Sequence, residues 1–230
     1  NYLSGTTASG LFEAKLAHEE FHSADNKPVE NHAYEPAYDD EEIKELCGIC
    51  DHMVFNSFNQ LEHHRPVWGK AVEEGRLSVG IRINPEFSTQ DTTEIYDPCA
   101  KGSRLGVCLR NMPDRLPSGV EGIHFHTLCE QGFEPLETTF LKVEQEFSRF
   151  FPDPLDENLE GFDADDRGKI KWINLGGGHH ITREGYQLDV LEACIRRFQE
   201  TYGLQVYLEP GEAIVWEAGD FVTTVVDIIH

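Results

Sequence analysis

The sequence predicts an α/β fold, a barrel of the (β/α)8 type with one unit missing. Segments with strand character alternate with segments of helical periodicity along the 230 residues. This order favours a parallel sheet, because neighbouring parallel strands need a crossover connection that is usually a helix. Roughly seven such units follow one another, which suits a barrel better than an open sheet. The pattern then changes to strands without helices, so an all-β unit is expected to begin near the end.

Each predicted element has a local signal. Strands are expected where β-branched, aromatic or alternating apolar residues lie between turn residues: Gly5–Ser9, Val29–Tyr38, His52–Phe55, Leu77–Ile83, Gly122–His126, Trp172–Leu175 and Leu204–Leu208. Helices are expected where apolar residues recur every three or four positions: Leu11–His22, Asp39–Cys50, Phe58–Val72, Leu136–Phe150 and Leu191–Tyr202. Pro66 should break the third helix. Residues 84–114 and the acidic residues 152–167 are expected to be loops.

The end of the chain is predicted to change architecture. Ala213–Trp216 and Phe221–Ile229 have strand character with no helix between them. Residues 1–212 are therefore assigned to the barrel, and residues 213–230 to the start of a C-terminal β-domain. The chain begins at Asn1 rather than at Met and ends in a strongly β-favouring run, so we expect a fragment of a longer protein.

Charge and composition exclude several classes of function. The chain has 19 Lys and Arg against 42 Asp and Glu, a formal net charge of −23, which argues against nucleic acid as a partner. The charge permits a cationic ligand, although a solvated acidic surface also explains it. We see no apolar run long enough for a membrane span and no signal peptide. The six cysteines are too sparse for a disulfide scaffold, so a reducing, cytoplasmic setting is expected.

The most informative segment is KWINLGGGHHI, residues 171–181. A mostly apolar run ends in Gly176, Gly177 and Gly178, and a segment with helical periodicity follows. This order predicts a strand, a tight loop and a helix start. Bare backbone N–H groups and the positive end of a helix would together suit an anion, most often a phosphate. The alternative is a flexible turn between a strand and a helix.

Further candidate residues follow the predicted strands, where the sites of parallel barrels lie. They are Ser9, Asn56, Arg82, His126, Gly176 to Gly178 and Glu209. His126 should point the same way as His124. It can stack on a planar cofactor or act as an acid or base, unless it is a hydrogen-bonded core histidine. Glu209, in the turn EPGE, can bind a cationic nitrogen or can be an ordinary polar turn residue.

No metal site is predicted. Cys47 and Cys50 form a CxxC motif, but no second ligand pair accompanies it, and both residues fall on the expected buried face of a helix. The neighbouring pairs His63–His64 and His179–His180 should diverge, so that neither pair readily faces one ion. Nucleophile-elbow, Walker and GxGxxG motifs are absent from the sequence.

Three segments in this order, IHFHTLCE, KWINLGGGHHITR and VYLEPGEA, resemble carboxynorspermidine (carboxyspermidine) decarboxylase. YDPCAKGSRLGV and GTTASGLFEAKLA fit the same family, so the resemblance covers nearly the whole chain. The family belongs to the fold-type III decarboxylases that use pyridoxal phosphate (PLP), with ornithine and diaminopimelate decarboxylases as relatives. The resemblance implies a barrel of the alanine racemase/ornithine decarboxylase type, a C-terminal β-domain and a homodimer.

The resemblance also implies an activity, that of a PLP-dependent carboxy-lyase of polyamine biosynthesis. Such an enzyme removes CO2 from carboxynorspermidine or carboxyspermidine and yields norspermidine or spermidine. A diaminopimelate- or ornithine-type decarboxylase is the first alternative. A non-catalytic homologue that binds or regulates a decarboxylase is the second, and a scaffold without a ligand is the third.

Roles for individual residues follow from the motif positions. His126 would stack on the pyridine ring as the catalytic residue present in the chain. Gly176, Gly177 and Gly178 would hold the phosphate, with Gly211 also at the cofactor. Glu209 would pair with the protonated ring nitrogen, which makes the ring a better electron sink. Arg82 could support Glu209 from behind, and Arg104 resembles a basic residue that relatives use near the dimer interface.

Two departures from the wider family stand out. Glu212 occupies a position where ornithine-type relatives have Arg; it would meet an amine of the polyamine substrate or be held away from the phosphate. The lysine that forms the Schiff base with the cofactor is not found, because its strand should precede Gly5. The 230 residues alone are therefore expected to be inactive.

Overall fold

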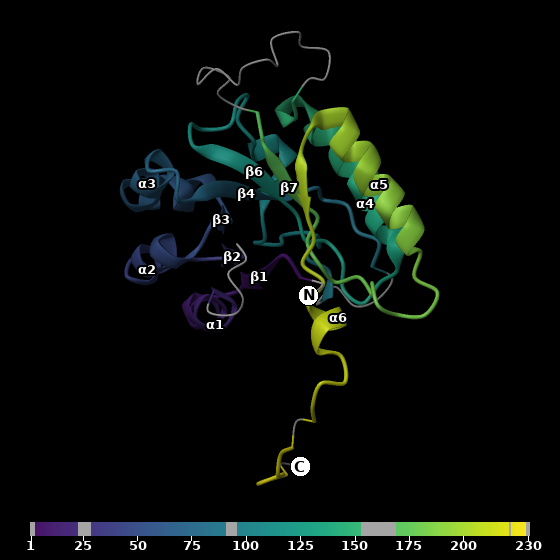
Figure 1. Ribbon diagram of the computed structural model, residues 1–230. Coiled ribbons are helices and arrows are strands. Elements are labelled where there is room, and N and C mark those ends of the chain that lie inside the picture. Colours follow the sequence, from purple (N-terminus) through teal and green to yellow (C-terminus); the bar gives the residue numbers. More distant parts are fainter. Residues whose placement is uncertain (1–2, 23–28, 91–95, 153–168, 221, 229–230) are drawn as a thin grey trace.

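The computed structural model describes residues 3–22, 29–90, 96–152, 169–220 and 222–228. Its centre is an eight-stranded parallel sheet with the order β1-β2-β3-β4-β6-β7-β8, and β5 pairs with β4 (Figure 1). The strands are β1 (Gly5–Ala8), β2 (Glu30–Tyr34), β3 (His52–Phe55), β4 (Ser78–Asn84), β5 (Val107–Cys108), β6 (Val120–His124), β7 (Trp172–Asn174) and β8 (Gln205–Tyr207). This sheet confirms the predicted α/β class and parallel order.

The sheet curls as a barrel does. β1 and β8 are the two ends of the pairing path, yet His32 of β2 meets Tyr207 of β8 with ring centroids 4.7 Å apart. A cavity of about 370 Å³ lies between the end strands and is lined by residues of both, including Thr6, Thr7 and Val206. The predicted barrel with one strand position open is therefore present.

Helices cover the outer face of the sheet. They are α1 (Leu11–His22), α2 (Glu42–Ile49), α3 (Phe58–Glu73), α4 (Phe133–Phe147) and α5 (Leu188–Tyr202). A further helix, α6 (Gly211–Val215), has no buried residue and lies below the sheet in Figure 1. Short 3-10 turns cover Leu109–Asn111 and Ser148–Phe150. Figure 1 shows α1 to α3 on one flank and α4 and α5 on the other. None of the helices in the described part of the chain is long and apolar enough to cross a membrane.

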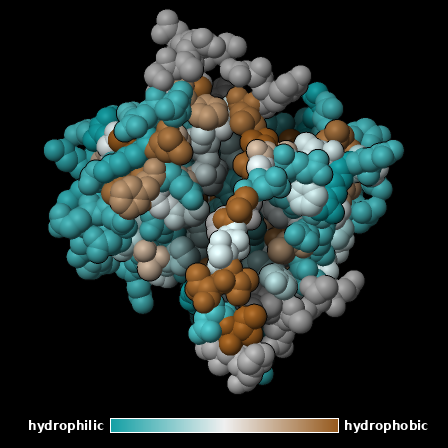
Figure 2. All heavy atoms as spheres, turned by 90° about the horizontal axis from the view of Figure 1, so that it is seen from below, coloured by the Kyte–Doolittle hydropathy of each residue, from teal (hydrophilic) through white to brown (hydrophobic). Residues whose placement is uncertain are grey.

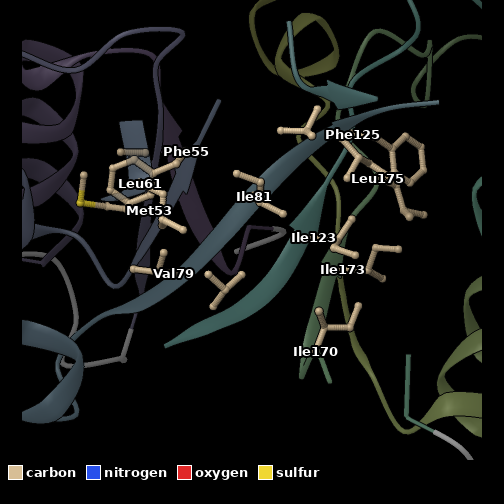
Figure 3. Packing of buried hydrophobic residues seen from close by; sticks show 14 of the residues in the cluster. Met53, Phe55, Leu61, Val79, Ile81, Ile123, Phe125, Ile170, Ile173 and Leu175 are labelled. Atoms are coloured by element: carbon tan, nitrogen blue, oxygen red, sulfur yellow. The ribbon is translucent and has the colours of Figure 1, made fainter. Parts of the chain in front are cut away.

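The core lies between the strands and these helices. All residues of β3 are buried, as expected for a parallel strand covered on both faces. Figure 3 shows Met53 and Phe55 beside Leu61 of α3, and Ile123 and Ile173 together farther along the sheet. Between α4 and α5, Phe140 and Phe198 meet with ring centroids 4.5 Å apart. Burying one such aromatic side chain stabilises the fold by roughly 1.5–3 kcal/mol.

Several local predictions are wrong, among them the loop over residues 84–114, which contains β5 and a 3-10 turn. α3 continues through Pro66, because the buried Leu61 and Trp68 hold both halves against the sheet, and the Trp68 indole donates to the Leu61 carbonyl at 2.8 Å. The helix after the glycine loop begins only at Leu188, with turns before it. Gly211–Val215 is a helix rather than a strand.

The last of these differences has a clear local cause. Pro210 lies at the N-cap of α6 and Glu212 in its first turn, where a proline and an acidic side chain both suit a helix start. The β-branched Ile214 and Val215 are exposed and have no strand beside them in the described part of the chain. Residues 222–228 also have no strand assignment. The boundary proposed at residues 212 and 213 stays a prediction, and the predicted loop at 152–167 lies almost wholly outside the described residues.

Candidate functional site

The site centres on Glu209, which follows β8 and meets side chains from the two preceding strands of the sheet, β6 and β7. His124, at the end of β6, places its Nε2 3.1 Å from Glu209 Oε2. Asn174, at the end of β7, donates from Nδ2 to Glu209 Oε1 at 2.7 Å. The three residues come together because parallel strands end at the same edge of the sheet. Both carboxylate oxygens are thus fixed, and each keeps further acceptor capacity.

The surroundings keep Glu209 ionised. Burial alone would raise the pKa of this carboxyl, yet the charge and hydrogen bond of His124, helped by His126 and Asn174, lower the pKa to about 2. Its side chain is only 12% exposed, so the negative charge is directed into the protein rather than into bulk water. A fixed and desolvated carboxylate of this kind suits a cationic nitrogen.

The sequence predicts that His126 is the last residue of a strand. In the structure β6 ends at His124, and His126 lies just beyond it. Its Nδ1 accepts a hydrogen bond from the Gly177 N–H at 3.2 Å. Burial, with the nearby charge of Arg82, lowers the pKa of His126 to about 4, so the ring is neutral at neutral pH. A neutral ring that accepts at Nδ1 carries its proton on Nε2.

Arg82 is buried on β4 and acts on the backbone of the site. Its Nη2 donates to the His126 carbonyl at 3.0 Å, and its guanidinium lies 4.7 Å from the centroid of the Tyr34 ring. Tyr34 in turn stacks on His124, with ring centroids 5.3 Å apart. Any support that Arg82 gives to Glu209 therefore runs through His126, Tyr34 and His124.

The glycine loop is packed so closely that side chains cannot be added. A Cβ on Gly177 would lie 2.1 Å from the Glu209 carbonyl oxygen, and one on Gly178 would lie 2.0 Å from the Leu128 carbonyl oxygen. Gly176 and Gly178 also have φ values of 71° and 77°. These glycines therefore allow the loop to touch the ends of its neighbouring strands.

Hydrogen bonds within the protein reduce the number of glycine N–H groups that this loop can offer to an anion. The Gly176 N–H donates to Asn174 Oδ1 at 2.8 Å, and the Gly177 N–H donates to His126. Among the hydrogen bonds of the described residues, none uses the Gly178 N–H. Since α5 begins only at Leu188, its N-terminus does not directly follow the loop. Gly178 is thus the glycine whose N–H is ready for a ligand.

A large cavity opens beside these residues. It has a volume of about 1040 Å³, and its lining includes His126, Gly178, Glu209, Gly211 and Glu212. Arg104 also lines this cavity. Figure 2 shows the molecule from below, the side on which α6 lies. Residues 214–228 at the end of the chain include several exposed apolar side chains. The volume is at the upper end of the range for small-molecule sites.

Glu212 lies on the rim of the cavity and already has a cationic partner. Arg183 Nη2 donates to Glu212 Oε1 at 2.9 Å, and His180 Nδ1 lies 3.1 Å from Oε2. Arg183 also lies over Trp216, 4.9 Å from the ring centroid. Glu212 is thereby drawn toward the segment after the glycine loop.

Asn56 and Ser9 have local roles in the structure. Asn56 Oδ1 accepts from the Tyr34 hydroxyl and from the Gly106 N–H, both at 2.8 Å, and its Nδ2 donates to the Arg104 carbonyl at 2.8 Å. It therefore ties the loop that carries Arg104 to the end of β3. Ser9 donates from its N–H and its hydroxyl to Glu13 in the first turn of α1.

The cysteine motif belongs to the core, as predicted. Cys47 and Cys50 are buried, and Cys47 Sγ lies 3.7 Å from Met53 Sδ. Burial raises the pKa of the Cys47 thiol to about 11 and that of Cys50 to about 12. Both thiols are therefore protonated and unreactive at neutral pH.

The expectation that His63 and His64 diverge is wrong. Asp40 lies between them, with Oδ1 2.9 Å from His63 Nε2 and 3.6 Å from His64 Nδ1. The sequence does not show this meeting, because Asp40 belongs to the turn before α2, whereas both histidines belong to α3.

Two important site residues were also not assigned from the sequence. His124 and Asn174 hold Glu209, but they lie 85 and 35 positions from it in the chain. A signal was present, because each of them lies near the end of a predicted strand, Gly122–His126 or Trp172–Leu175. Only the strand order shows that these three ends are neighbours.

Two curated proteins are similar to this chain along its length. The chain is 39% identical over 229 residues to a carboxynorspermidine/carboxyspermidine decarboxylase from Campylobacter jejuni. It is 36% identical over 229 residues to a carboxyaminopropylagmatine decarboxylase from a Synechocystis species. These alignments cover 100% and 99% of this chain and 52% of each relative, so the chain spans about half the length of the curated relatives that it matches. No family model matches the chain.

Solved structures extend the likeness to three dimensions. A crystal structure of carboxynorspermidine decarboxylase from C. jejuni, complexed with norspermidine, aligns with a TM-score of 0.74 at 36% identity, over 100% of this chain and 52% of that one. An arginine decarboxylase from Paramecium bursaria Chlorella virus aligns with a TM-score of 0.60 at 13% identity, over 91% of this chain and 51% of that one, and shares the fold alone. The chain is therefore a homologue, along its whole length, of the carboxynorspermidine/carboxyspermidine decarboxylases.

Proposed function

We propose that the protein carrying this chain is a PLP-dependent decarboxylase that acts on carboxynorspermidine or carboxyspermidine. The observation that carries the proposal is Glu209, a buried carboxylate held ionised by His124 and Asn174 beside the glycine loop and His126. The similarity to decarboxylases with these substrates in their names supports it. The activity is that of the whole protein, of which the residues described here supply one side of the site.

The residues present fit the cofactor. Glu209 offers an ionised carboxylate to a protonated pyridine nitrogen, and neutral His126 offers a ring to stack on the pyridine face. The Gly178 N–H, which has no acceptor among the described residues, would donate to the phosphate. When bound, PLP supplies an electron sink for the carbon that loses CO2. A carboxylate with a pKa of about 2 suits this chemistry, because it stays negative and favours the protonated ring nitrogen.

The other residues of the chain would position these groups. His124 and Asn174 fix the two oxygens of Glu209, so that its charge points in one direction. Arg82 holds the His126 carbonyl and thereby the segment that carries the ring. The hydrogen bond from Asn56 would hold the loop that places Arg104 in the lining of the cavity.

The cavity has an acidic character that suits a substrate with several ammonium groups. Its lining has four acidic residues, Asp97, Glu130, Glu209 and Glu212, against two basic ones, Lys101 and Arg104. Glu212 would either meet a substrate amine or be held away from the phosphate, and its pairing with Arg183 supports the second version. We further propose that the full-length protein is a cytoplasmic homodimer, with Arg104 near the interface. Size-exclusion chromatography with light scattering tests the dimer.

Carboxyaminopropylagmatine is a second candidate substrate. The Synechocystis relative named for it is 36% identical to this chain, close to the identity of the carboxynorspermidine relative. It is likewise a carboxylated polycation by its name, so an acidic cavity does not separate the two.

A substrate panel tests the proposal. The full-length protein is incubated with PLP and with carboxynorspermidine, carboxyspermidine, carboxyaminopropylagmatine, diaminopimelate or ornithine, and CO2 release is measured. We expect the highest kcat/KM with the first two, and a loss of kcat of about 10²- to 10³-fold in Glu209→Gln. Greater activity on diaminopimelate or ornithine would favour those enzymes. PLP absorbance without turnover of any substrate would favour a non-catalytic homologue, and a lack of PLP absorbance would favour a bare scaffold.

A further inference from the structure

Three polar side chains converge at the outer surface where the turn before α2 meets α3. Asp40 comes from the turn, and His63 and His64 come from α3. Their ligand atoms all lie within 4.8 Å of one another. This cluster is formed on the helical layer, apart from the residues that line the large cavity.

The Asp40 carboxylate can contact the two histidines because its neighbour, Asp39, accepts the hydrogen bonds that stabilise the turn. Asp39 Oδ1 accepts from the Glu41 N–H at 2.8 Å, and the Asp39 carbonyl accepts from the Ile43 N–H at 3.1 Å. The contacts of Asp40 instead run to the other helix, 2.9 Å to His63 Nε2 and 3.6 Å to His64 Nδ1.

These separations suit one ion. In a tetrahedral zinc site with bonds of about 2.0–2.2 Å, neighbouring ligand atoms lie roughly 3.4 Å apart. The two measured separations from Asp40 lie on either side of that value. The histidine rings are also inclined at 77°, so their in-plane lone pairs can point toward a shared position.

One of the three side chains is buried and two are exposed, which favours binding of an ion from solvent. The His64 side chain is 4% exposed and packs against Phe55, which fixes its ring, whereas His63 and Asp40 are 64% and 68% exposed. The exposed side leaves room for a water as the fourth ligand.

A second cluster lacks this geometry. Glu30, His32 and His52 also lie within 4.8 Å of one another, at the amino ends of β2 and β3. There, however, the two histidine rings stack with centroids 4.2 Å apart and an angle of 28°. Lone pairs in nearly parallel planes do not converge on one ion, so this cluster serves as a control.

We propose that Asp40, His63 and His64 bind one divalent ion of the late first-row metals, Zn²⁺ being the best fit, and that this ion clamps the turn before α2 to α3. Imidazole and carboxylate ligands in an open, water-completed site suit zinc and its neighbours rather than calcium or magnesium. The alternative is a hydrogen-bonded pair of Asp40 and His63 that needs no metal.

Metal titration of tag-free, full-length protein with its cofactor bound tests the proposal. Zn²⁺ is titrated against a competing chelator in the parent protein and in Asp40→Asn, His63→Gln and Glu30→Gln. We expect one site that is weakened at least about tenfold by each of the first two changes and left unchanged by the third. Co²⁺ substitution should give the absorption of a four-coordinate site in the parent and in Glu30→Gln only.

Several results would overturn this site. They are the absence of Zn²⁺ binding, equal affinity in Asp40→Asn and His63→Gln, or a loss confined to Glu30→Gln. Both test residues are largely exposed, so misfolding is not expected, and circular dichroism without metal checks this. Activity without added metal should be the same in His63→Gln as in the parent, since His63 lies outside the cavity.

Discussion

Two glutamate–histidine pairs lie at opposite ends of the same sheet. At the carboxyl ends of the strands, Glu209 and His124 are 3.1 Å apart, and at the amino ends Glu30 and His32 are 3.2 Å apart. Their surroundings differ. The Glu209 side chain is 12% exposed and has Asn174 as a second donor, whereas Glu30 is 44% exposed.

The comparison teaches that contact distance alone does not make a site. At the carboxyl ends, burial and several donors fix one carboxylate in its charged state next to a cavity. At the amino ends, His52 stacks on His32 and meets Trp172 edge-on, so the three rings form a packed aromatic cluster. Function at one end and packing at the other is the usual division in parallel barrels.

The largest expected effect is on the stability of the glycine loop at the carboxyl ends of the strands. Gly178→Ala would drive a Cβ into the Leu128 carbonyl at a position with φ of 77°, so we expect a loss of about 4 kcal/mol in the free energy of unfolding. The matched control is Gly185→Ala, which has φ of 82° but no atom within 4 Å, and should lose about 1 kcal/mol. Urea unfolding measures both. Equal losses would show that backbone conformation matters and close packing does not.

The two pairs can be compared directly by neutralising each carboxylate. Glu209→Gln leaves His124 without its charged partner in a buried place, so we expect a loss of about 3 kcal/mol in stability. Glu30→Gln changes a pair that is partly in water and should cost at most about 1 kcal/mol. Urea unfolding at pH 7 gives both values. If the two losses were alike, burial would not distinguish the two ends.

The two ends should also respond to acid in different pH windows. Burial, and then the charge of His32, lowers the pKa of His52 from 6.5 to about 4, so the folded state resists a proton that the unfolded state binds. Stability should therefore fall as the pH drops from 6.5 to 4, and His52→Gln should reduce this fall by about 2 kcal/mol.

Glu209 supplies the counterpart at lower pH. Its pKa is lowered from 4.5 to about 2, so its contribution is complete above pH 4.5 and is lost as the pH falls toward 2. The stability difference between the parent protein and Glu209→Gln should shrink in that lower window only. Thermal unfolding followed across both windows measures each effect, and a shared window would contradict the assignment.

The smallest effect on stability is expected for Glu212 at the rim of the large cavity. Arg183 is 47% exposed and Glu212 26% exposed, so Glu212→Gln should change stability by no more than about 0.5 kcal/mol. Its informative readout is the KM of the full-length enzyme. A raised KM with little change in kcat would support contact with a substrate amine, whereas an unchanged KM would refute it. Arg183→Gln serves as the control for the loss of the pair itself.

Much of this molecule could be predicted from its sequence. The sequence predicts the strand His52–Phe55 with its observed bounds, because four residues of strand character lie between clear turn residues. The parallel order followed from the alternation of strands and helices, and Glu209, His126 and the glycine loop stood out because polar residues and glycines follow strands. These are local signals, readable without knowing which segments touch.

Other features were decided only by the tertiary structure. A short segment such as Ala213–Val215 can form strand or helix, and here no neighbouring strand in the described residues offers it hydrogen bonds. The partners of Glu209 and the meeting of Asp40 with His63 join segments far apart in the chain. Composition and periodicity determine what a segment can become, but burial, ionisation and ligand geometry depend on which strand and helix ends are brought together.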